Sequence, residues 1–307
     1  MSHETSVPAH GISRDARPIV SIGMPAYNAE ATIAAAIDSL LRQTYPHFEL
    51  IISDNASSDR TWSIIEDYAR RDDRIVALRQ PHNVGANGNY SAVFRAARGQ
   101  YFKWASSNDW CAPSFLEQCV AHLDAHRETV LVSPRTRLFE GSIERFSDYP
   151  HDVAFDESDA VERFVKVGRA LMLNNVLNGL MRSKVLAQTR LIDHFPGADN
   201  VLVGHLALLG RIVLLDEPLF YRRMDDGTAT RLMSSEALHR HHYPVKTLRS
   251  LFPAWRFMGG LLRTAVSSGL TVGDTMRALR VVLRETYWRK AYLRRDVVNA
   301  LHQMVGR

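Results

Sequence analysis

The chain begins with a regular alternation of short apolar runs and amphipathic stretches. The apolar, β-branched runs predict strands at 18–24, 48–53, 74–78 and 101–105. Between them, apolar residues recur at three- and four-residue steps, which predicts helices at 29–43, 62–71 and 89–97. Strands and helices that alternate in this way indicate a parallel sheet with helices on both faces, and ligands of such sheets bind at the carboxyl ends of the strands.

The pattern is less regular after residue 112. It predicts helices at 113–126, 158–167 and 199–209, an irregular region at 139–156, and short strands at 129–133, 174–181, 212–215 and 219–222. From about Ser234 the chain is helical and rich in arginine, and six apolar residues follow helical spacing: Val272, Met276, Leu279, Leu283, Tyr287 and Ala291. We expect this tail to form an amphipathic helix pair.

Charge separates the tail from the rest of the chain. Residues 1–235 carry 25 lysines and arginines against 29 aspartates and glutamates, whereas residues 236–307 carry 13 against 4. The formal net charge of +5 therefore arises in the tail. Nucleic acid and an anionic membrane surface are both partners compatible with such a basic segment.

The composition is that of a globular protein in a reducing compartment. The 307 residues are 46% hydrophobic, which is enough for a sizeable core. Cys111 and Cys119 are predicted to lie on one helical segment, so they form neither a disulfide framework nor a zinc pattern, and a cytoplasmic setting is the simpler interpretation. The sequence has no run of about 18 uninterrupted apolar residues and no signal-peptide core, so we expect no segment that spans a membrane by itself.

Four motifs follow the predicted strands in order: PAYNAEATIAAAIDSLLRQTY, ELIISDNASSDRT, NVGANGNYSAV and YFKWASSNDWCAPSFLE. In this order and at this spacing they resemble the nucleotide-sugar half of family 2 glycosyltransferases with the GT-A fold. The resemblance is close over residues 19–126 and looser to about residue 231. It implies an α/β fold with a mixed, mostly parallel sheet flanked by helices, here followed by a C-terminal helical extension.

The resemblance covers two of the expected parts of the chain, and its two ends are separated by composition and charge. We expect a flexible N-terminus at 1–17, a nucleotide-sugar-binding half at 18–128, an acceptor-binding half of the same domain at 129–233, and a basic helical extension at 234–307.

The ends of the first two predicted strands form the expected nucleotide pocket. The resemblance implies that four residues line it: Pro25, Ala26, Tyr27 and Glu30. An aromatic ring at a strand end can stack on a base, and the carboxylate of Asp54 can accept a hydrogen bond from a ring nitrogen such as N3 of uracil. The alternative for the first motif is a plain strand-to-helix turn. Caps of the next helix are the better interpretation of three further residues: Asn55, Ser57 and Ser58.

The segment 83–89 contains the glycines of a phosphate loop without the spacing of a P-loop or a dinucleotide fingerprint. The resemblance implies polar contacts to the nucleotide from Gly85 and Asn89. Gly88 stands where the family often has an arginine. An equal alternative is a loop whose glycines only permit positive φ.

The polar run 106–109 stands where the family commonly has a D-x-D or D-x-D-D run, and it keeps only the last acid. The resemblance implies that Asn108 faces the ribose and that Asp109 holds a divalent cation, Mn²⁺ or Mg²⁺, against the diphosphate. A single carboxylate is a sparse anchor for a cation. The alternative role of Asp109 is to cap the helix that follows.

Two further acids complete the expected site. Asp199 matches the acidic position of the family's general base, which takes a proton from the acceptor hydroxyl in an inverting transfer, and a helix N-cap is its compatible alternative. In the segment 221–231 the family often has an arginine and a histidine near the diphosphate. Arg222 is the expected donor-binding arginine, and Asp225 stands in the place of the histidine, so we hypothesise that it is a second metal carboxylate. A solvated turn is the alternative.

Four histidines lack any metal-binding pattern and are expected in the core or in solvent: His205, His239, His241 and His242. The tail places seven arginines and lysines among Tyr287, Trp288 and Tyr292. Such a helix can lie on an anionic membrane leaflet, on the inner face of the membrane, or it can dock on the catalytic domain with its charges in water.

The sequence therefore predicts a glycosyltransferase that moves a sugar from UDP or another nucleotide diphosphate to a saccharide or lipid-linked acceptor. The resemblance implies inversion, metal assistance and a pathway of cell-envelope or exopolysaccharide synthesis, with no nucleic-acid partner. Two alternatives remain open, a nucleotidyltransferase and a non-catalytic protein that binds nucleotide or glycan.

Overall fold

A nine-stranded sheet runs through the computed structural model, which describes residues 18–225 and 251–305. Four strands pair in parallel in the order β3-β2-β1-β4: β1 Val20–Ala26, β2 Phe48–Asp54, β3 Ile75–Arg79 and β4 Tyr101–Trp104. The sheet continues as β8-β6-β9-β5, with β7 on β6. The bounds of these strands are β5 Trp110–Cys111, β6 Thr129–Phe139, β7 Phe146–Asp148, β8 Leu180–Arg182 and β9 Arg211–Arg223. The predicted mixed sheet is confirmed.

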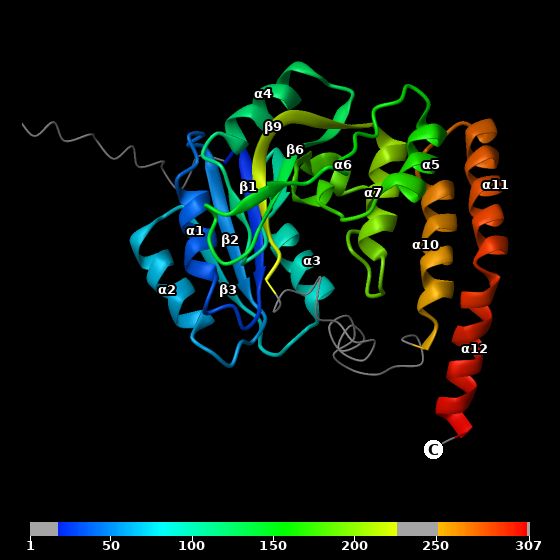
Figure 1. Ribbon diagram of the computed structural model, residues 1–307, viewed down its shortest axis with the longest axis horizontal. Helices are drawn as coiled ribbons and strands as arrows, with labels where there is room; N and C mark the ends of the chain where they lie inside the picture. Colours follow the sequence, from blue (N-terminus) through cyan, green and yellow to red (C-terminus); the bar gives the residue numbers. More distant parts are fainter. Residues whose placement is uncertain (1–17, 226–250, 306–307) are drawn as a thin grey trace, which may run out of the picture.

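Helices cover both faces of the sheet because its strands are apolar on both sides. One hydrophobic cluster joins the sheet to α1 Ile33–Leu41, α2 Thr61–Arg71 and α4 Phe115–Ala125. A second cluster joins it to α3 Ala86–Ala96 and α7 Ala198–Leu209. Side chains alternate along β4, so that Tyr101 belongs to the first cluster and Phe102 to the second. Figure 1 shows α1 and α2 together on one side of the sheet.

The structure corrects two strand predictions. The segment 174–181 is not a strand throughout, because it contains a 3₁₀ turn, Val176–Asn178, before β8. Gly179 lies so close to β6 that an added Cβ would stand 2.4 Å from the carbonyl oxygen of Val132. The strands predicted at 212–215 and 219–222 are one strand, β9, whose pairing with β6 shifts register near Pro218. A proline has no N–H to donate and is tolerated at such an irregularity.

The two cysteines do not share a helix. Cys111 lies in β5 and Cys119 lies in α4, so the prediction of one helical segment is wrong. Both thiols are free and buried, and burial raises the pKa of each above its usual range. Both therefore stay protonated and act as small apolar groups of the core.

The C-terminal part differs from the expected helix pair, because residues 251–305 form three helices. These are α10 Pro253–Ser267, α11 Val272–Trp288 and α12 Lys290–Val305. α10 packs on α7, and α11 packs on α5 Ala160–Ala170. Figure 1 shows the three helices at the end of the molecule opposite α1 and α2. The expectations for residues 1–17 and 234–250 lie outside the described residues. Within the described residues, no helix is long and apolar enough to cross a membrane.

Five of the six apolar residues predicted to follow helical spacing lie on α11, and Ala291 lies on α12. Leu279 packs against a buried cluster, whereas the other four on α11 face solvent. Ala278 and Val282 are the buried residues of this helix. The recurring apolar residues lie on another side of it, and we call them the α11 stripe: Val272, Met276, Leu283 and Tyr287, which are 48–83% exposed. Only one face of α11 is therefore used for packing within the described part of the chain.

Candidate active site

A cavity of about 490 Å³ opens beside the loop that follows β4, between α7 and the end of β9. Its lining includes four residues that the sequence analysis singled out: Asn108, Asp109, Asp199 and Arg222. They come from three segments far apart in the chain. The fold thus brings the predicted cation ligand, the predicted base and a cationic side chain into one space.

Asp109 is held by the backbone of β9. The amide of Arg223 donates to its Oδ1 at 2.9 Å, and Nε of Arg223 donates to the backbone carbonyl of Asn108 at 3.1 Å. The Oδ1 of Asn108 accepts a hydrogen bond from the hydroxyl of Ser106. The helix-cap alternative for Asp109 is wrong, because α4 begins after Ser114 and has no side-chain cap.

The surroundings of Asp109 are cationic. Burial raises the pKa of this carboxyl above its usual range, while the Arg223 amide and the charges of Arg222 and Lys103 act in the opposite direction. Lys103 is fully buried in β4, where it donates to the carbonyl of Asn178 and lies 4.3 Å from the centre of the Phe115 ring. One carboxylate among several cations is an arrangement suited to an anionic ligand.

Asp199 lies in the first turn of α7. The turn before it uses the left-handed backbone of Gly197, with φ 81°, and no side chain caps the helix, so the N-cap alternative is not observed. Nδ2 of Asn174 donates to Oδ2 of Asp199 at 3.0 Å and also reaches Oδ1 of Asn200 at 3.2 Å. Asn174 therefore fixes the orientation of the predicted base.

Several lining residues were missed by the sequence analysis, chiefly Tyr90, Trp104, Asn174 and Arg223. Burial, with the charge of Asp109 as the next cause, raises the pKa of Tyr90 to about 12, so its hydroxyl remains a hydrogen-bond donor. Nη1 of Arg222 donates to Oδ1 of Asn175 at 2.7 Å. In the sequence, the available signal for these residues was the adjacent pairs Asn174–Asn175 and Arg222–Arg223. Only the fold shows that the two pairs lie at the same cavity.

The predicted nucleotide residues gather at the carboxyl ends of β1 and β2, outside the lining of this cavity. Pro25 and Ala26 pair with Ser53 and Asp54. The Tyr27 side chain is 51% exposed, so its ring is accessible for stacking.

Asp54 and Glu30 already have partners. Asp54 is fully buried, accepts from the amide of Ser57 and lies 3.6 Å from Nε of Arg79. Glu30 accepts from the Nε of Arg60 at 3.2 Å. Both carboxylates thus stabilise the turn between β2 and α2 in the absence of a nucleotide.

Asn89 connects the first two strands. Its Nδ2 donates to the carbonyl of Ser53 at 2.8 Å and to that of Ala26 at 3.4 Å, while its buried Oδ1 has no partner among the described residues. Gly85 precedes α3 with φ 79°, so positive φ is one use of this glycine, as the alternative interpretation held.

The capping interpretation of Asn55, Ser57 and Ser58 is wrong. The amide of Asn28 donates to the hydroxyl of Ser57, and the amide of Ser58 donates to Oδ1 of Asn28. Asn55 instead accepts from the amide of Val84. These polar groups hold three loops together, because the carboxyl ends of neighbouring parallel strands lie side by side.

Asp225 does not line the cavity that contains Asp109. Its carboxylate forms an ion pair with Arg223 at 2.7 Å and accepts from the amide of Gly141 at 2.7 Å. No group of three or more His, Cys, Asp or Glu residues within the described part of the chain is placed to hold a metal ion. His205 is in the core as expected, whereas His239, His241 and His242 lie outside the described residues.

The donor set nevertheless fits a cation that is bound mainly by its substrate. Asp109 uses Oδ1 for the Arg223 amide, and its Oδ2 has no hydrogen bond from the described residues. Mg²⁺ and similar hard cations are commonly held by one or two carboxylates together with substrate phosphates. A cation between Asp109 and a diphosphate is therefore consistent with this site.

The comparisons with known proteins agree with this fold and assign the family. The model of the family described as glycosyl transferase family 2 matches residues 21–184, more than half of the chain, and the chain belongs to that family. One relative is the UDP-Glc:alpha-D-GlcNAc-diphosphoundecaprenol beta-1,3-glucosyltransferase WfaP of Escherichia coli, which is 38% identical over 92 residues, 30% of this chain and 36% of WfaP. The chain spans about a third of the length of the curated relatives that it matches.

Solved structures confirm the fold over most of the chain. S. aureus TarS 1–349 in complex with UDP-GlcNAc aligns with a TM-score of 0.62 at 17% identity, over 88% of this chain and 74% of that chain. The mannosyltransferase PcManGT from Pyrobaculum calidifontis, in complex with GDP-Man and Mn²⁺, aligns with a TM-score of 0.50 at 14% identity, over 94% of this chain and 87% of that chain.

Proposed function

We propose that this chain transfers a sugar, with inversion, from a nucleotide-diphosphate sugar to a hydroxyl of a saccharide or lipid-linked acceptor. The observation that carries the proposal is the convergence of Asn108, Asp109, Asp199 and Arg222 on one cavity. UDP-Glc as the donor of WfaP and UDP-GlcNAc in the TarS complex support a UDP-sugar. Synthesis of a cell-envelope or extracellular polysaccharide is the process that we propose.

The donor is held at two connected places in this proposal. The base lies near Tyr27 and Asp54, with Pro25, Ala26 and Glu30 around it and with polar contacts from Gly85 and Asn89. The ribose lies near Asn108, and the diphosphate lies between Asp109 and Arg222. A bound Mn²⁺ or Mg²⁺ neutralises charge on the diphosphate as it leaves. Asp109 is the residue that holds it, and Asp225 is a weaker proposal for a second carboxylate because it is already paired with Arg223.

Asp199 is the proposed general base. A base must lie within hydrogen-bond reach of the proton that it removes, and its orientation must be fixed. The hydrogen bond from Asn174 fixes one carboxylate oxygen of Asp199 and leaves the other for an acceptor hydroxyl. Attack of that hydroxyl opposite the diphosphate forms the new glycosidic bond, breaks the bond to the diphosphate and transfers the hydroxyl proton to Asp199.

We also propose that α11 rests on an anionic membrane surface, on the cytoplasmic side. The α11 stripe supplies exposed apolar side chains, and Arg280 and Arg284 are exposed beside it. An amphipathic helix of this kind lies in the interface plane with its apolar face inward and its basic groups near anionic lipid. This position gives the active site access to a lipid-linked acceptor.

The proposed function is tested by hydrolysis of UDP-sugars in the presence of Mn²⁺, measured with purified wild type, Asp109→Asn and Asp199→Asn. We expect slow release of UDP by wild type and a loss of at least about 100-fold for Asp199→Asn, the lower end of the range for general-base catalysis. Asp109→Asn should also lose most of the activity, because it lacks the proposed cation ligand. UDP binding, measured by calorimetry, should weaken for Asp109→Asn and stay unchanged for Asp199→Asn.

Asp216→Asn is the matched control, because the Asp216 side chain is 94% exposed and lies outside the cavity. This variant should hydrolyse UDP-sugars at the wild-type rate. Tight UDP binding without turnover by wild type would instead favour a non-catalytic nucleotide-binding protein.

A further inference from the structure

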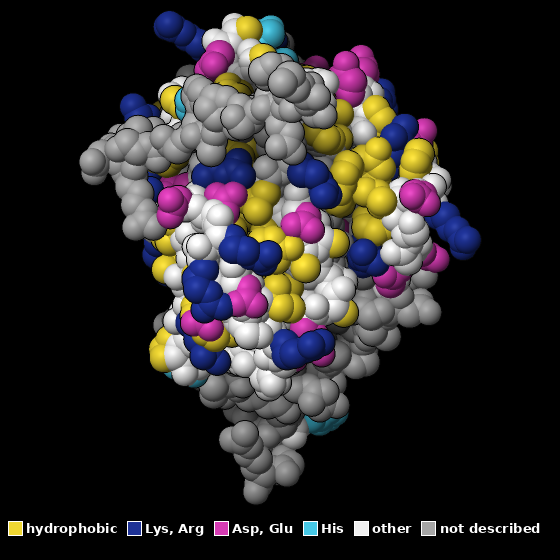
Figure 2. Space-filling model, turned by 90° about the vertical axis from the view of Figure 1, so that its left-hand side faces the viewer, with side chains coloured by type: hydrophobic (Ala, Val, Ile, Leu, Met, Phe, Trp, Pro, Cys, Tyr) yellow, Lys and Arg dark blue, Asp and Glu magenta, His cyan; other side chains and the backbone are white. Residues whose placement is uncertain are grey.

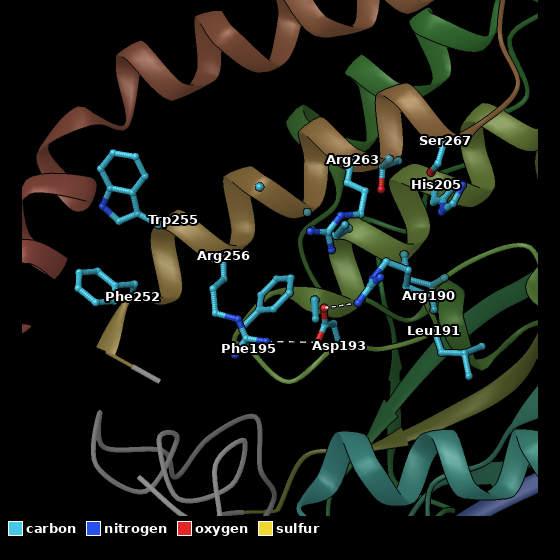
Figure 3. Close-up of a pocket in the computed structure, with 16 residues that line it drawn as sticks. Arg190, Leu191, Asp193, Phe195, His205, Phe252, Trp255, Arg256, Arg263 and Ser267 are labelled. Atoms are coloured by element: carbon cyan, nitrogen blue, oxygen red, sulfur yellow. Dashed lines mark hydrogen bonds and ion pairs between the residues drawn. The ribbon is translucent and has the colours of Figure 1, made fainter. Parts of the chain in front are cut away.

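A second cavity, of about 580 Å³, lies on the other side of α7 from Asp199. Its walls are α7, α10 and the segment 190–195, and Figure 3 shows side chains from all three around the space. Phe195 and Ala198 line both this cavity and the one that contains Asp199. A ligand of the second cavity would therefore lie next to the proposed catalytic base.

The polar part of this cavity is positively charged. Three arginines line it, Arg190, Arg256 and Arg263, against the single carboxylate of Asp193 among the described lining residues. Asp193 is shared by Arg256 at 3.2 Å and Arg190 at 3.8 Å. Figure 3 shows Arg263 and Arg190 extending into the same space from α10 and from the segment before α7. Arg263 has no ion pair among the described residues, so its positive charge is available to a ligand.

A buried polar group also faces the cavity without a partner. His205 on α7 is 5% exposed, and its Nε2 has no hydrogen-bond partner among the described residues. Burial lowers the pKa of His205, so the ring is neutral near pH 7 and can donate or accept one hydrogen bond at Nε2. A buried polar atom without a partner is uncommon and is typically satisfied by a ligand or water.

The rest of the lining is apolar. It is formed by side chains of α7, of the segment 190–195, and of α10 with the residue before it: Leu191, Phe195, Val201, Leu202, Phe252 and Trp255. Gly260 lets α10 approach this wall closely, because an added Cβ would stand 3.2 Å from the Phe195 ring. The volume lies within the range of about 300–1,000 Å³ that is usual for small-molecule sites. An apolar wall with convergent guanidinium groups matches a ligand that has a phosphate head and an apolar chain.

We infer that the cavity between α7 and α10 binds the phosphate of an amphipathic phosphate ester, with Arg263, Arg190 and His205 at the phosphate and the apolar chain against α7 and α10. The inference rests on the proposed function, because it identifies the ligand as the phosphate-bearing end of a lipid-linked acceptor. The sugar end of the same acceptor would then reach Asp199 past Ala198.

The test uses full-length protein and calorimetry with three probes below their aggregation limits: octyl phosphate, inorganic phosphate and octanol. We expect octyl phosphate to bind more tightly than either of the other two. Arg263→Ala should weaken octyl phosphate binding at least about tenfold, as expected for a lost charge-assisted hydrogen bond. His205→Leu should weaken it less, because this side chain is uncharged.

Arg280→Ala is the matched control, since Arg280 is an exposed arginine of α11 outside the cavity, and it should bind octyl phosphate as wild type does. UDP binding with Mn²⁺ should be unchanged in all three variants, which shows that they are folded.

Three results would overturn the inference. The first is that Arg263→Ala binds octyl phosphate as tightly as wild type does. The second is that inorganic phosphate binds as tightly as octyl phosphate, which indicates a free-phosphate site. The third is that octanol binds as tightly as octyl phosphate, which indicates an apolar pocket only. If octyl phosphate binding depends on Arg263 while no UDP-sugar is hydrolysed, the cavity is a binding site for an amphipathic phosphate ester, and the proposed glycosyltransferase activity is rejected.

Discussion

The two ends of the molecule present different surfaces to solvent. On the face formed by α1 and α2, basic and acidic side chains are interspersed, as Figure 2 shows. Ion pairs such as Arg60–Glu30 and Arg70–Asp67 contribute to this mixture. At the opposite end, α11 exposes an apolar stripe, and the tail to which it belongs has 13 basic residues against 4 acidic ones.

The difference shows that the two ends have different uses for their helices. α1 buries its apolar residues against the sheet, and α2 carries two acidic and two basic side chains beside it, Glu66, Asp67, Arg70 and Arg71, which is typical of a solvated face. α11 buries two residues and keeps a second apolar side exposed. An exposed apolar side of this kind marks a surface for a partner. Our proposals accordingly place donor binding at the strand ends and contact with a partner at the far helices.

The largest expected effect concerns the donor end. Asp199→Asn should reduce transfer to an acceptor by about 10²- to 10⁴-fold, because the variant lacks the proposed base. Steady-state rates with UDP-sugar and a saccharide acceptor measure this loss. Asn200→Ala is the neighbouring control and should retain most of the rate, since the Asn200 side chain accepts one hydrogen bond from the described residues, from Nδ2 of Asn174. Equal losses in both variants would mean that the α7 turn as a whole is needed.

The packing of the tail gives the second prediction. Met258 on α10 is 3% exposed in a cluster with Phe164, Leu208, Val282 and Leu293. Met258→Ala should lower the free energy of unfolding by about 2–5 kcal/mol through lost burial and a residual cavity. Chemical denaturation measures the change, with Met276→Ala on the α11 stripe as a control that should stay within about 0.5 kcal/mol. A change of the same size in both variants would contradict the observed burial.

The α11 stripe gives the third prediction. Leu283→Ser should weaken binding to vesicles that contain anionic lipid by about tenfold. This corresponds to a loss of roughly 1.4 kcal/mol of binding free energy when the leucine side chain is no longer there to be buried in the membrane. Cosedimentation measures this, and high salt should weaken wild-type binding because the flanking arginines contribute. Val266→Ser, an exposed apolar residue of α10 outside the stripe, is the control. Unchanged binding by Leu283→Ser would favour a tail that only docks on the catalytic domain.

The smallest expected effect is a pH dependence from His205. Burial lowers the pKa of His205 in the folded state, so the unfolded chain binds this proton more readily. The stability that this residue contributes is complete above the unfolded pKa of about 6.5 and decreases as the pH falls below that value. In phosphate-free buffer, His205→Gln should lose less unfolding free energy than wild type between about pH 7 and 5. His47→Gln, at an exposed position, should resemble wild type.

The sheet and its first helices could be predicted because their patterns are local. Each strand from β1 to β4 is a contiguous apolar run, and its boundaries were predicted to within two residues. β8 could not be predicted, because its place is set by the close approach of Gly179 to β6. The exposure of the α11 stripe was also beyond the sequence, since helical spacing marks an apolar side without showing whether anything covers it.

The candidate site was predictable only in part, for the same reason. Asp109 and Asp199 were predicted because they match acidic positions of the family that the motifs resemble, and the fold places both on one cavity. Asn174 was missed because its role depends on a contact with Asp199 across 25 positions of the chain. Asp225 was assigned from its position alone, and its ion pair with Arg223 could not be read from spacing.

Because α7 lies between the two cavities, this helix sets the distance between the residues that face each of them. Asp199 and His205 are six positions apart on it, a separation of about 9 Å along the axis at 1.5 Å per residue. If the two proposals hold, an acceptor that touches both residues must have at least this distance between its reactive hydroxyl and its phosphate. The rise of one helix would then set a lower limit on acceptor length.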